Sequence, residues 1–237
     1  MILPDGLFSP PIAHRGLWSA DGFAENSLGA IERACQAGYG VEFDVRLSSD
    51  GEAVVFHDDT LERMTGLEGP VSAFSAGELA VTPLLGGPDG IPSLEQVLSQ
   101  IHGRAMLLVE LKAGGDLEAL AARTAQLLRS YRDPFAVISF DAEALAWFAR
   151  RWPDVPRGLD AFWARPDEAE AAERLERDCA LANPHFLVLG LEAAAGPTAA
   201  ACRARGRPVV AWTVRSGEDA DTVAEHCDNF IFEGFTA

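Results

Sequence analysis

Residues 40–47 alternate apolar and polar side chains with a period of two, which predicts a β-strand. Glu42 and Asp44 lie two positions apart in this strand, so their side chains share one face. The next four residues, Ser-Ser-Asp-Gly, predict a turn, and residues 53–56 predict a second strand that leads into His57. Neighbouring acids oppose strand propensity and repel each other, which suggests a bound cation. The stretch thus brings two carboxylates and a histidine together, as an active site would.

From residue 93 onward, apolar segments typical of buried strands alternate with segments of helical spacing. This order predicts a parallel sheet, and the number of repeats favours closure into a barrel. The predicted strands are 11–16, 40–47, 53–56, 106–112, 135–140, 157–162, 186–191, 208–214 and 230–233. The predicted helices are 28–37, 93–101, 117–131, 141–151, 168–179, 197–205 and 218–226.

Nine predicted strands are one more than an eight-stranded barrel needs, and the sequence leaves open which one is surplus. The gap between Leu47 and Ala53 is too short for a crossover helix, so the strands on either side of it are expected to form a hairpin. We expect an α/β fold, a single irregular (β/α)8 TIM barrel that spans residues 1–237 as one domain. Residues 59–92 are rich in glycine and proline, and we expect a small insertion there, after the strand ending at His57.

The net charge of −17 limits the classes of partner. Nucleic acids and anionic membranes both require clustered lysine and arginine, so neither is expected to bind. The four cysteines show no Cys-x-x-Cys or zinc spacing and are expected to be reduced. We find no run of membrane-spanning length and no signal peptide, and we therefore expect a cytoplasmic protein without stable membrane anchoring. A homo-oligomer stays open.

Acidic residues recur near the ends of predicted strands, where a barrel of this type gathers its active site. Glu42, Asp44 and Glu110 offer hard oxygen ligands, which suit Mg²⁺ or Ca²⁺ better than Zn²⁺. The alternative is a set of buried ion pairs, for which the nearby cations are Arg15, Arg46 and Lys112. Charge inside a strand is costly without a strong partner, so we favour one bound divalent cation. Both interpretations can hold together.

His14 and His57 are candidates for proton transfer, because histidine titrates near neutral pH and both lie near the same acids. For either histidine alone, a hydrogen-bonded core position is the alternative. The other three histidines lack such partners in the sequence and are expected to be structural or exposed; they are His102, His185 and His226.

A cation beside a metal ion is what a phosphate group would need. Lys112 shares a strand face with Glu110, so both are expected to reach the site. Arg15 points away from the site in an ideal strand and joins it only if the chain turns at Gly16. Trp212 is either a core residue or an aromatic wall for a substrate.

Seven short motifs, taken in order, resemble those of the glycerophosphodiester phosphodiesterase family. They cover roughly residues 10–215 and are His14-Arg15-Gly16, Glu25-Asn26-Ser27, Glu42-x-Asp44-Val45, Asp50-Gly51 before Val54-Val55-x-His57-Asp58, Glu110-x-Lys112, Ser139-Phe140 and Trp212-Thr213-Val214. Each motif alone is weak, but seven in order form a specific signal.

The sequence departs from the family pattern at three places. Ala24 stands where a proline is common, and Arg215 stands where an asparagine is frequent. The last strand usually carries Thr-Asp and then Pro, whereas this chain has Phe-Glu-Gly-Phe at residues 232–235. The last two departures change the rim of the site.

The resemblance implies a barrel of the phosphatidylinositol phospholipase C superfamily that hydrolyses glycerophosphodiesters to sn-glycerol 3-phosphate and an alcohol. It implies the following site: one divalent cation, Mg²⁺ or Ca²⁺, on Glu42, Asp44 and Glu110; His14 and His57 as the acid–base pair; Arg15 and Lys112 on the phosphate. Two alternatives stay open: another phosphodiester such as a lysophospholipid, and a non-catalytic barrel that binds phosphorylated ligands. The sequence does not identify the released head group, the metal or the histidine that acts as base.

Overall fold

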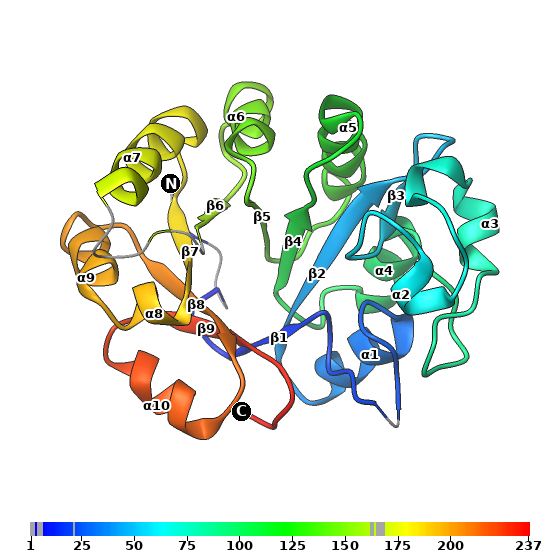
Figure 1. Cartoon of the computed structure of the whole chain (residues 1–237), viewed down its shortest axis with the longest axis horizontal. Coiled ribbons are helices and arrows are strands. Elements are labelled where there is room, and N and C mark those ends of the chain that lie inside the picture. Colours follow the sequence, from blue (N-terminus) through cyan, green and yellow to red (C-terminus); the bar gives the residue numbers. More distant parts are fainter. Residues whose placement is uncertain (1–2, 4–6, 21, 162–163, 165–168) are drawn as a thin grey trace.

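The computed structural model describes residues 3, 7–20, 22–161, 164 and 169–237. Within these ranges nine strands form one sheet in the order β1-β9-β8-β7-β6-β5-β4-β2-β3, and a further pairing of β1 with β2 closes eight of them into a parallel barrel (Figure 1). The strands are β1 Ile12–His14, β2 Gly40–Leu47, β3 Ala53–Val55, β4 Leu107–Leu111, β5 Phe135–Ser139, β6 Arg157–Asp160, β7 Phe186–Gly190, β8 Val209–Val214 and β9 Asn229–Phe232.

Helices connect the parallel strands and surround the barrel (Figure 1). They are α1 Leu28–Gln36, α2 Glu62–Thr65, α3 Ala76–Ala80, α4 Leu94–Ile101, α5 Leu117–Leu128, α6 Ala142–Arg151, α7 Ala169–Ala182, α8 Leu191–Ala194, α9 Pro197–Ala204 and α10 Gly217–Ala224. The expected (β/α)8 TIM barrel is confirmed. The short helix α8 begins at the last residue of a predicted strand, and two predicted boundaries, Phe162 and Glu168, lie outside the described residues.

The surplus strand is β3, which pairs antiparallel with β2 and lies outside the ring. This pairing confirms the predicted hairpin, in which Val45 faces Val55. Because β3 continues the sheet beyond β2, it carries His57 to the same end of the barrel as the carboxyl ends of the parallel strands.

Each barrel strand separates two apolar layers, because successive side chains point to opposite faces. Val41, Phe43 and Val45 of β2 face outward into the layer between sheet and helices, together with Val109 of β4. Leu108 of β4 belongs to a smaller apolar cluster inside the ring. Glu42 and Asp44 alternate with the outward residues of β2, so the sequence period directs both carboxylates inward.

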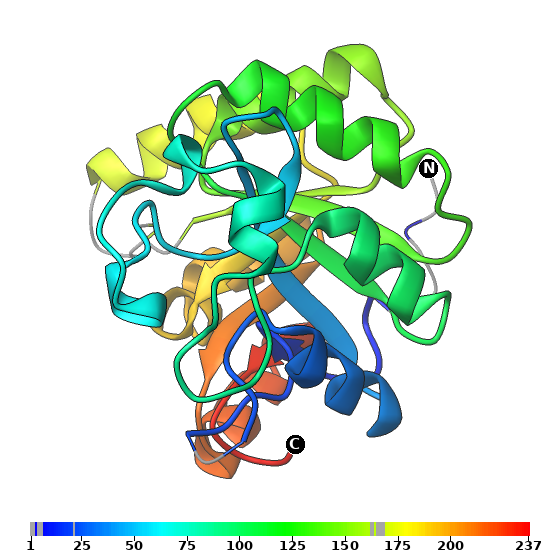
Figure 2. The ribbon, with the colours of Figure 1, turned by 90° about the vertical axis from the view of Figure 1, so that its right-hand side faces the viewer.

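The segment between β3 and α4 is the expected insertion and includes α2, α3 and the 3₁₀-helix Val71–Ala73. It has a small apolar cluster of its own, which includes Phe56, Leu61 and Leu79. Figure 2 shows this segment in cyan, in front of β2. The insertion is thus a packed layer against the β2–β3 edge of the sheet.

None of the helices in the described part of the chain is both long enough and apolar enough to span a membrane.

A methyl group at Gly158 tests the packing inside the barrel. A Cβ there would lie 2.3 Å from Cε2 of Phe186, whose side chain is fully buried and cannot move aside freely. We expect Gly158→Ala to lower the free energy of unfolding by about 1–3 kcal/mol, measured by urea denaturation. Gly77→Ala, on an exposed helical position with no atom within 4 Å, is the control and should be neutral or slightly stabilising. Equal stability of both variants would contradict the expectation.

Candidate active site

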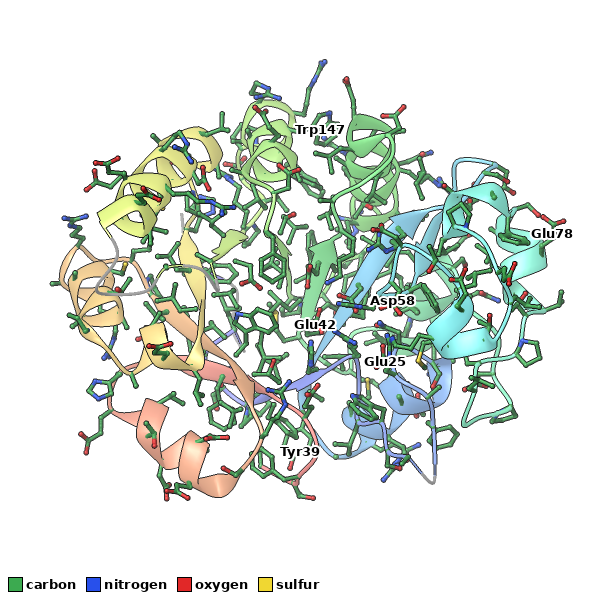
Figure 3. All side chains as sticks on the ribbon, viewed as in Figure 1. Glu25, Tyr39, Glu42, Asp58, Glu78 and Trp147 are labelled. Carbon is green, nitrogen blue, oxygen red and sulfur yellow. The ribbon has the colours of Figure 1, made fainter. Side chains whose placement is uncertain are left out.

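Strand register brings three acids of the sequence together. Glu42 lies level with His14 of β1, and Asp44 lies level with Glu110 of β4. Oxygen atoms of Glu42, Asp44 and Glu110 all lie within 4.8 Å of one another, and the three side chains are buried. Figure 3 shows Glu42 near the centre of the ring, with Glu25 and Asp58 close by, whereas Glu78 and Trp147 lie at its periphery. The predicted acidic cluster therefore forms at one end of the barrel.

Arg15 enters the site through a turn at the end of β1. Its backbone has φ 57°, and Gly16 follows with φ 79° at a place where a Cβ would lie 2.7 Å from the backbone of Ala30. Only glycine fits this close approach in the left-handed conformation. The turn lets the Arg15 backbone N–H donate to Glu42 (3.0 Å) and brings the guanidinium to within 3.4 Å of Asp44. The predicted condition for Arg15, a turn at Gly16, is confirmed.

Lys112, one residue beyond β4, bridges two of the acids. Its Nζ lies 2.8 Å from Asp44 and 2.7 Å from Glu110. It also lies 5.7 Å from the centre of the Phe140 ring. The ion-pair interpretation from the sequence therefore holds for Asp44 and Glu110. Arg46, which the same interpretation offered as a possible partner, instead binds Asp59 and the backbone oxygen of His57.

The pKa values of the three acids shift in different directions, because the positive charges of Lys112 and Arg15 act most strongly on one of them. Burial raises the pKa of Glu42 well above its usual value, and the charges of Asp44 and Glu110 raise it further. Burial and Asp44 also raise the pKa of Glu110, to about 7. Burial acts on Asp44 in the same direction, but the charges of Lys112 and Arg15 outweigh it and lower the pKa of Asp44. Asp44 therefore carries most of the negative charge of the cluster.

This acidic cluster fits a divalent cation. Oε1 of Glu42 is buried and has no hydrogen-bond partner among the described residues. An unpartnered buried oxygen is costly, and a cation would remove this cost. Carboxylate oxygens at this spacing suit Mg²⁺ or Ca²⁺. The side chains therefore fit a hard metal ion, and Asn26, whose amide donates to Asp44 at 2.7 Å, fixes one of them.

His14 is held by Glu233, which the sequence placed at the rim of the site without a predicted contact to a histidine. Its Nδ1 lies 2.5 Å from Oε2 of Glu233, just beyond β9. Burial would raise the pKa of Glu233, but the hydrogen bond and charge of His14, with Arg215, lower it to about 2. Glu233 is therefore an ionised acceptor, and Nδ1 of His14 donates to it. This leaves Nε2 of the imidazole for the site.

His57 has matching surroundings built from other elements. Its Nδ1 lies 2.6 Å from Oδ1 of Asp58. Arg63 of α2 donates to both oxygens of Asp58 (2.5 and 2.9 Å) and to Glu25 (2.5 Å). Glu25 also accepts from Arg15 at 2.8 Å. The insertion thus contributes a cation that ties His57 to the Arg15 side of the site.

Trp212 of β8 lies between the apolar interior and the site. It packs against the apolar cluster inside the ring, and it is half-buried. Its ring lies edge-on to His14 (6.2 Å between centres) and to Phe140 (5.3 Å). Trp212 is therefore partly a core residue and partly a wall of the site.

Asp160 is a further buried carboxyl at this end of the barrel. Burial raises its pKa well above the usual value, and the charge of Glu110 adds to the shift. It ends β6, whose predicted strand was weak and had no neighbouring acid or histidine, so no local signal marked it. The remaining histidines lie elsewhere: His102 ends α4 at an exposed position, His226 follows α10, and His185 accepts from the backbone N–H of Arg157.

Comparison with known proteins agrees with this geometry. Residues 14–227 match the glycerophosphoryl diester phosphodiesterase family. The chain is 33% identical over 159 residues to YhdW of Bacillus subtilis, an alignment that covers 62% of this chain and 64% of that relative. It is also 29% identical over 223 residues to a glycerophosphodiester phosphodiesterase of Caldanaerobacter subterraneus, which covers 89% of this chain and 87% of the relative.

A solved structure is similar over nearly the whole fold. A phosphodiesterase of Oleispira antarctica, determined in complex with the product sn-glycerol-3-phosphate, has a TM-score of 0.81 and 28% sequence identity. The similarity covers 95% of this chain and 93% of that protein.

Glu42→Gln tests whether the acidic cluster binds a metal ion. We expect Mg²⁺ or Ca²⁺ to raise the melting temperature of the wild type and EDTA to reverse the rise. At a metal concentration a hundred times Kd, binding should add about 2.7 kcal/mol to the free energy of unfolding. The variant keeps the shape of the side chain but loses a ligand charge, so its shift should be much smaller. Asp221→Asn, at an exposed position of α10, should retain the full shift. An equal metal response in all three proteins would contradict the site.

The lowered pKa of Glu233 predicts a pH dependence of stability. Its folded-state pKa is about 2 and its ordinary value is 4.5, so its ionised form stabilises the fold above about pH 4.5 and this contribution is lost as the pH falls toward 2. The free energy of unfolding of the wild type should therefore approach that of Glu233→Gln across this window. Urea denaturation at several pH values measures the gap, and a gap independent of pH would refute the assignment.

Proposed function

Because this chain belongs to the glycerophosphoryl diester phosphodiesterase family, we propose that it hydrolyses glycerophosphodiesters to sn-glycerol 3-phosphate and an alcohol. The observation that carries the proposal is the composition of the barrel mouth. Three buried carboxylates, two largely buried cations and two histidines held by carboxylates meet there. This set provides charge for a phosphodiester and proton-transfer groups on either side of it.

Arg15 and Lys112 are the proposed phosphate-binding residues. Both cations are largely buried, and both retain their charge, because the attraction of nearby acids exceeds the cost of burial and raises their pKa. The guanidinium of Arg15 offers a planar pair of donors, and the ammonium of Lys112 offers a compact charge. Together they would neutralise the non-bridging oxygens as negative charge develops at phosphorus.

His14 and His57 are the proposed acid–base pair. Nδ1 of each imidazole is engaged by a carboxylate, so Nε2 is the atom available for a proton. One histidine would accept the proton of the attacking oxygen, and the other would donate a proton to the departing alkoxide. The carboxylates fix the tautomer and the ring orientation, so the transfers need little rearrangement.

Glu42, Asp44 and Glu110 are the proposed ligands of one divalent cation, Mg²⁺ or Ca²⁺. When bound, such an ion acts as a Lewis acid toward phosphate oxygens. Trp212 would cover the apolar side of the substrate beside His14.

A second substrate class, the lysophospholipids, has one observation in its favour. Three of the four large apolar side chains that are exposed in the described residues lie on the insertion; they are Leu67, Val81 and Leu85. Exposed apolar side chains on the segment that also supplies Arg63 to the site suit contact with an acyl chain. Small glycerophosphodiesters and lysophosphatidylcholine should therefore be assayed side by side.

Release of sn-glycerol 3-phosphate from glycerophosphocholine and glycerophosphoethanolamine, with Mg²⁺, Ca²⁺ or EDTA, tests the reaction. We expect metal-dependent turnover, reduced about 10²–10⁴-fold in His14→Ala and in His57→Ala, because each removes one proton-transfer group. His102→Asn is the control, since His102 is exposed and has the positive φ of 44° that asparagine tolerates. Release by the histidine variants at the wild-type rate would refute their role, and turnover of lysophosphatidylcholine alone would favour the second substrate class.

A further inference from the structure

The two departures from the family pattern at the rim of the site contact each other. Nε and Nη2 of Arg215 both lie 2.8 Å from Oε1 of Glu233. The other oxygen of Glu233, Oε2, lies 2.5 Å from Nδ1 of His14. The carboxylate of Glu233 therefore bridges the two residues: one oxygen contacts Arg215 and the other contacts His14.

The backbone on both sides of this contact is anchored. The backbone N–H of Glu233 donates to the oxygen of Val214 at 3.0 Å, which joins the ends of β9 and β8. The backbone N–H of Arg215 donates to Asp219 at 3.1 Å, in the first turn of α10. Arg215 and Glu233 are thus fixed relative to each other before their side chains meet.

A glutamate at this position needs a second anchor. The family pattern has an aspartate in this strand, and the glutamate side chain has one more rotatable bond than an aspartate. A single hydrogen bond to His14 therefore fixes a glutamate less completely than it would fix an aspartate. Arg215 removes this freedom by holding Oε1. An exposed arginine contributes little to stability through such a pair, and the side chain of Arg215 is 65% exposed against 14% for Glu233. The contact therefore serves geometry more than stability.

We propose that Arg215 is a positioning residue, which holds Glu233 so that its second oxygen aims at Nδ1 of His14 and fixes the imidazole for proton transfer. This proposal rests on the proposed function, in which His14 moves a proton. The arrangement matches that of the other histidine, where Arg63 holds both oxygens of Asp58 and one of them contacts His57. Each imidazole thus has its own arginine-held carboxylate.

Steady-state kinetics with glycerophosphocholine test the proposal. Arg215→Ala should lower kcat about tenfold and leave KM within about twofold, because the substrate contacts stay and only the orientation of His14 loosens. Arg215→Lys should recover part of the loss. Arg104→Gln is the matched control, because Arg104 forms an equally close exposed pair with Glu32 (2.8 and 2.6 Å) far from either histidine in the sequence and on another element. An unchanged kcat in Arg215→Ala would overturn the proposal.

A double-mutant cycle separates positioning from direct substrate binding. If Arg215 acts through Glu233, Arg215→Ala should cost nothing further in a Glu233→Gln background. An equal loss in both backgrounds would overturn the proposal and assign Arg215 to the substrate itself.

A spectroscopic measurement without substrate keeps this proposal independent of the reaction. The Nδ1 proton of His14, donated to Glu233, should give a downfield resonance that is absent in Glu233→Gln and weakened by exchange in Arg215→Ala. A resonance unaffected in Arg215→Ala would overturn the positioning role. If the wild type hydrolyses no glycerophosphodiester while the resonance depends on Arg215, the proposed function fails and the positioning of His14 stands.

Discussion

The charge balance at the barrel mouth is the constraint on which the rest of the site depends. Three buried acids would repel one another, and an unpaired buried charge costs several kcal/mol. The structure meets this cost with cations delivered by different elements. Lys112 comes from the end of β4, and Arg15 comes from a left-handed turn after β1. The left-handed turn, the glycine that permits it and the strand register therefore together bring two cations to the buried acids.

Closure of the barrel is as necessary for this site as its charges. Glu233 and His14 are 219 residues apart and meet because β9 pairs with β1. The second histidine depends on another neighbour of β2, where the chain after β3 supplies Asp58 and the insertion supplies Arg63. Two histidines with similar surroundings thus arise from strands on either side of β2, and Glu25 links the arginine that holds Asp58 to Arg15.

The sequence predicted what its short-range periodicity encodes. The spacing of two residues placed Glu42 with Asp44 on the inward face, and the hairpin followed from the short gap before β3. The residues that hold the histidines had no such signal, because Glu233, Arg215 and Arg63 reach their partners through tertiary pairing rather than spacing. Asp58 stood beside His57 in a motif, yet its role depends on Arg63. The surplus strand could not be identified from the sequence, because it depends on which strands pair to close the ring, and no local sequence pattern encodes this pairing.

The proposed substrate is an anion, so the negative charges of the acids in the site must be neutralised for it to bind. The net charge of −17 repels phosphodiesters at long range, so the mouth of the barrel must differ from the rest of the surface. Most acids there contact a cationic side chain; the pairs are Glu25 with Arg15 and Arg63, Asp44 with Arg15 and Lys112, Asp58 with Arg63, Glu110 with Lys112, and Glu233 with Arg215. Glu42 has no lysine or arginine side chain within ion-pair distance among the described residues, and it keeps an unpartnered oxygen. Asp160 likewise has no lysine or arginine partner among the described residues and keeps an unpartnered oxygen, but it is not one of the three acids whose oxygens lie within 4.8 Å of one another. Within that cluster, Glu42 is therefore the acid best prepared to bind a metal ion.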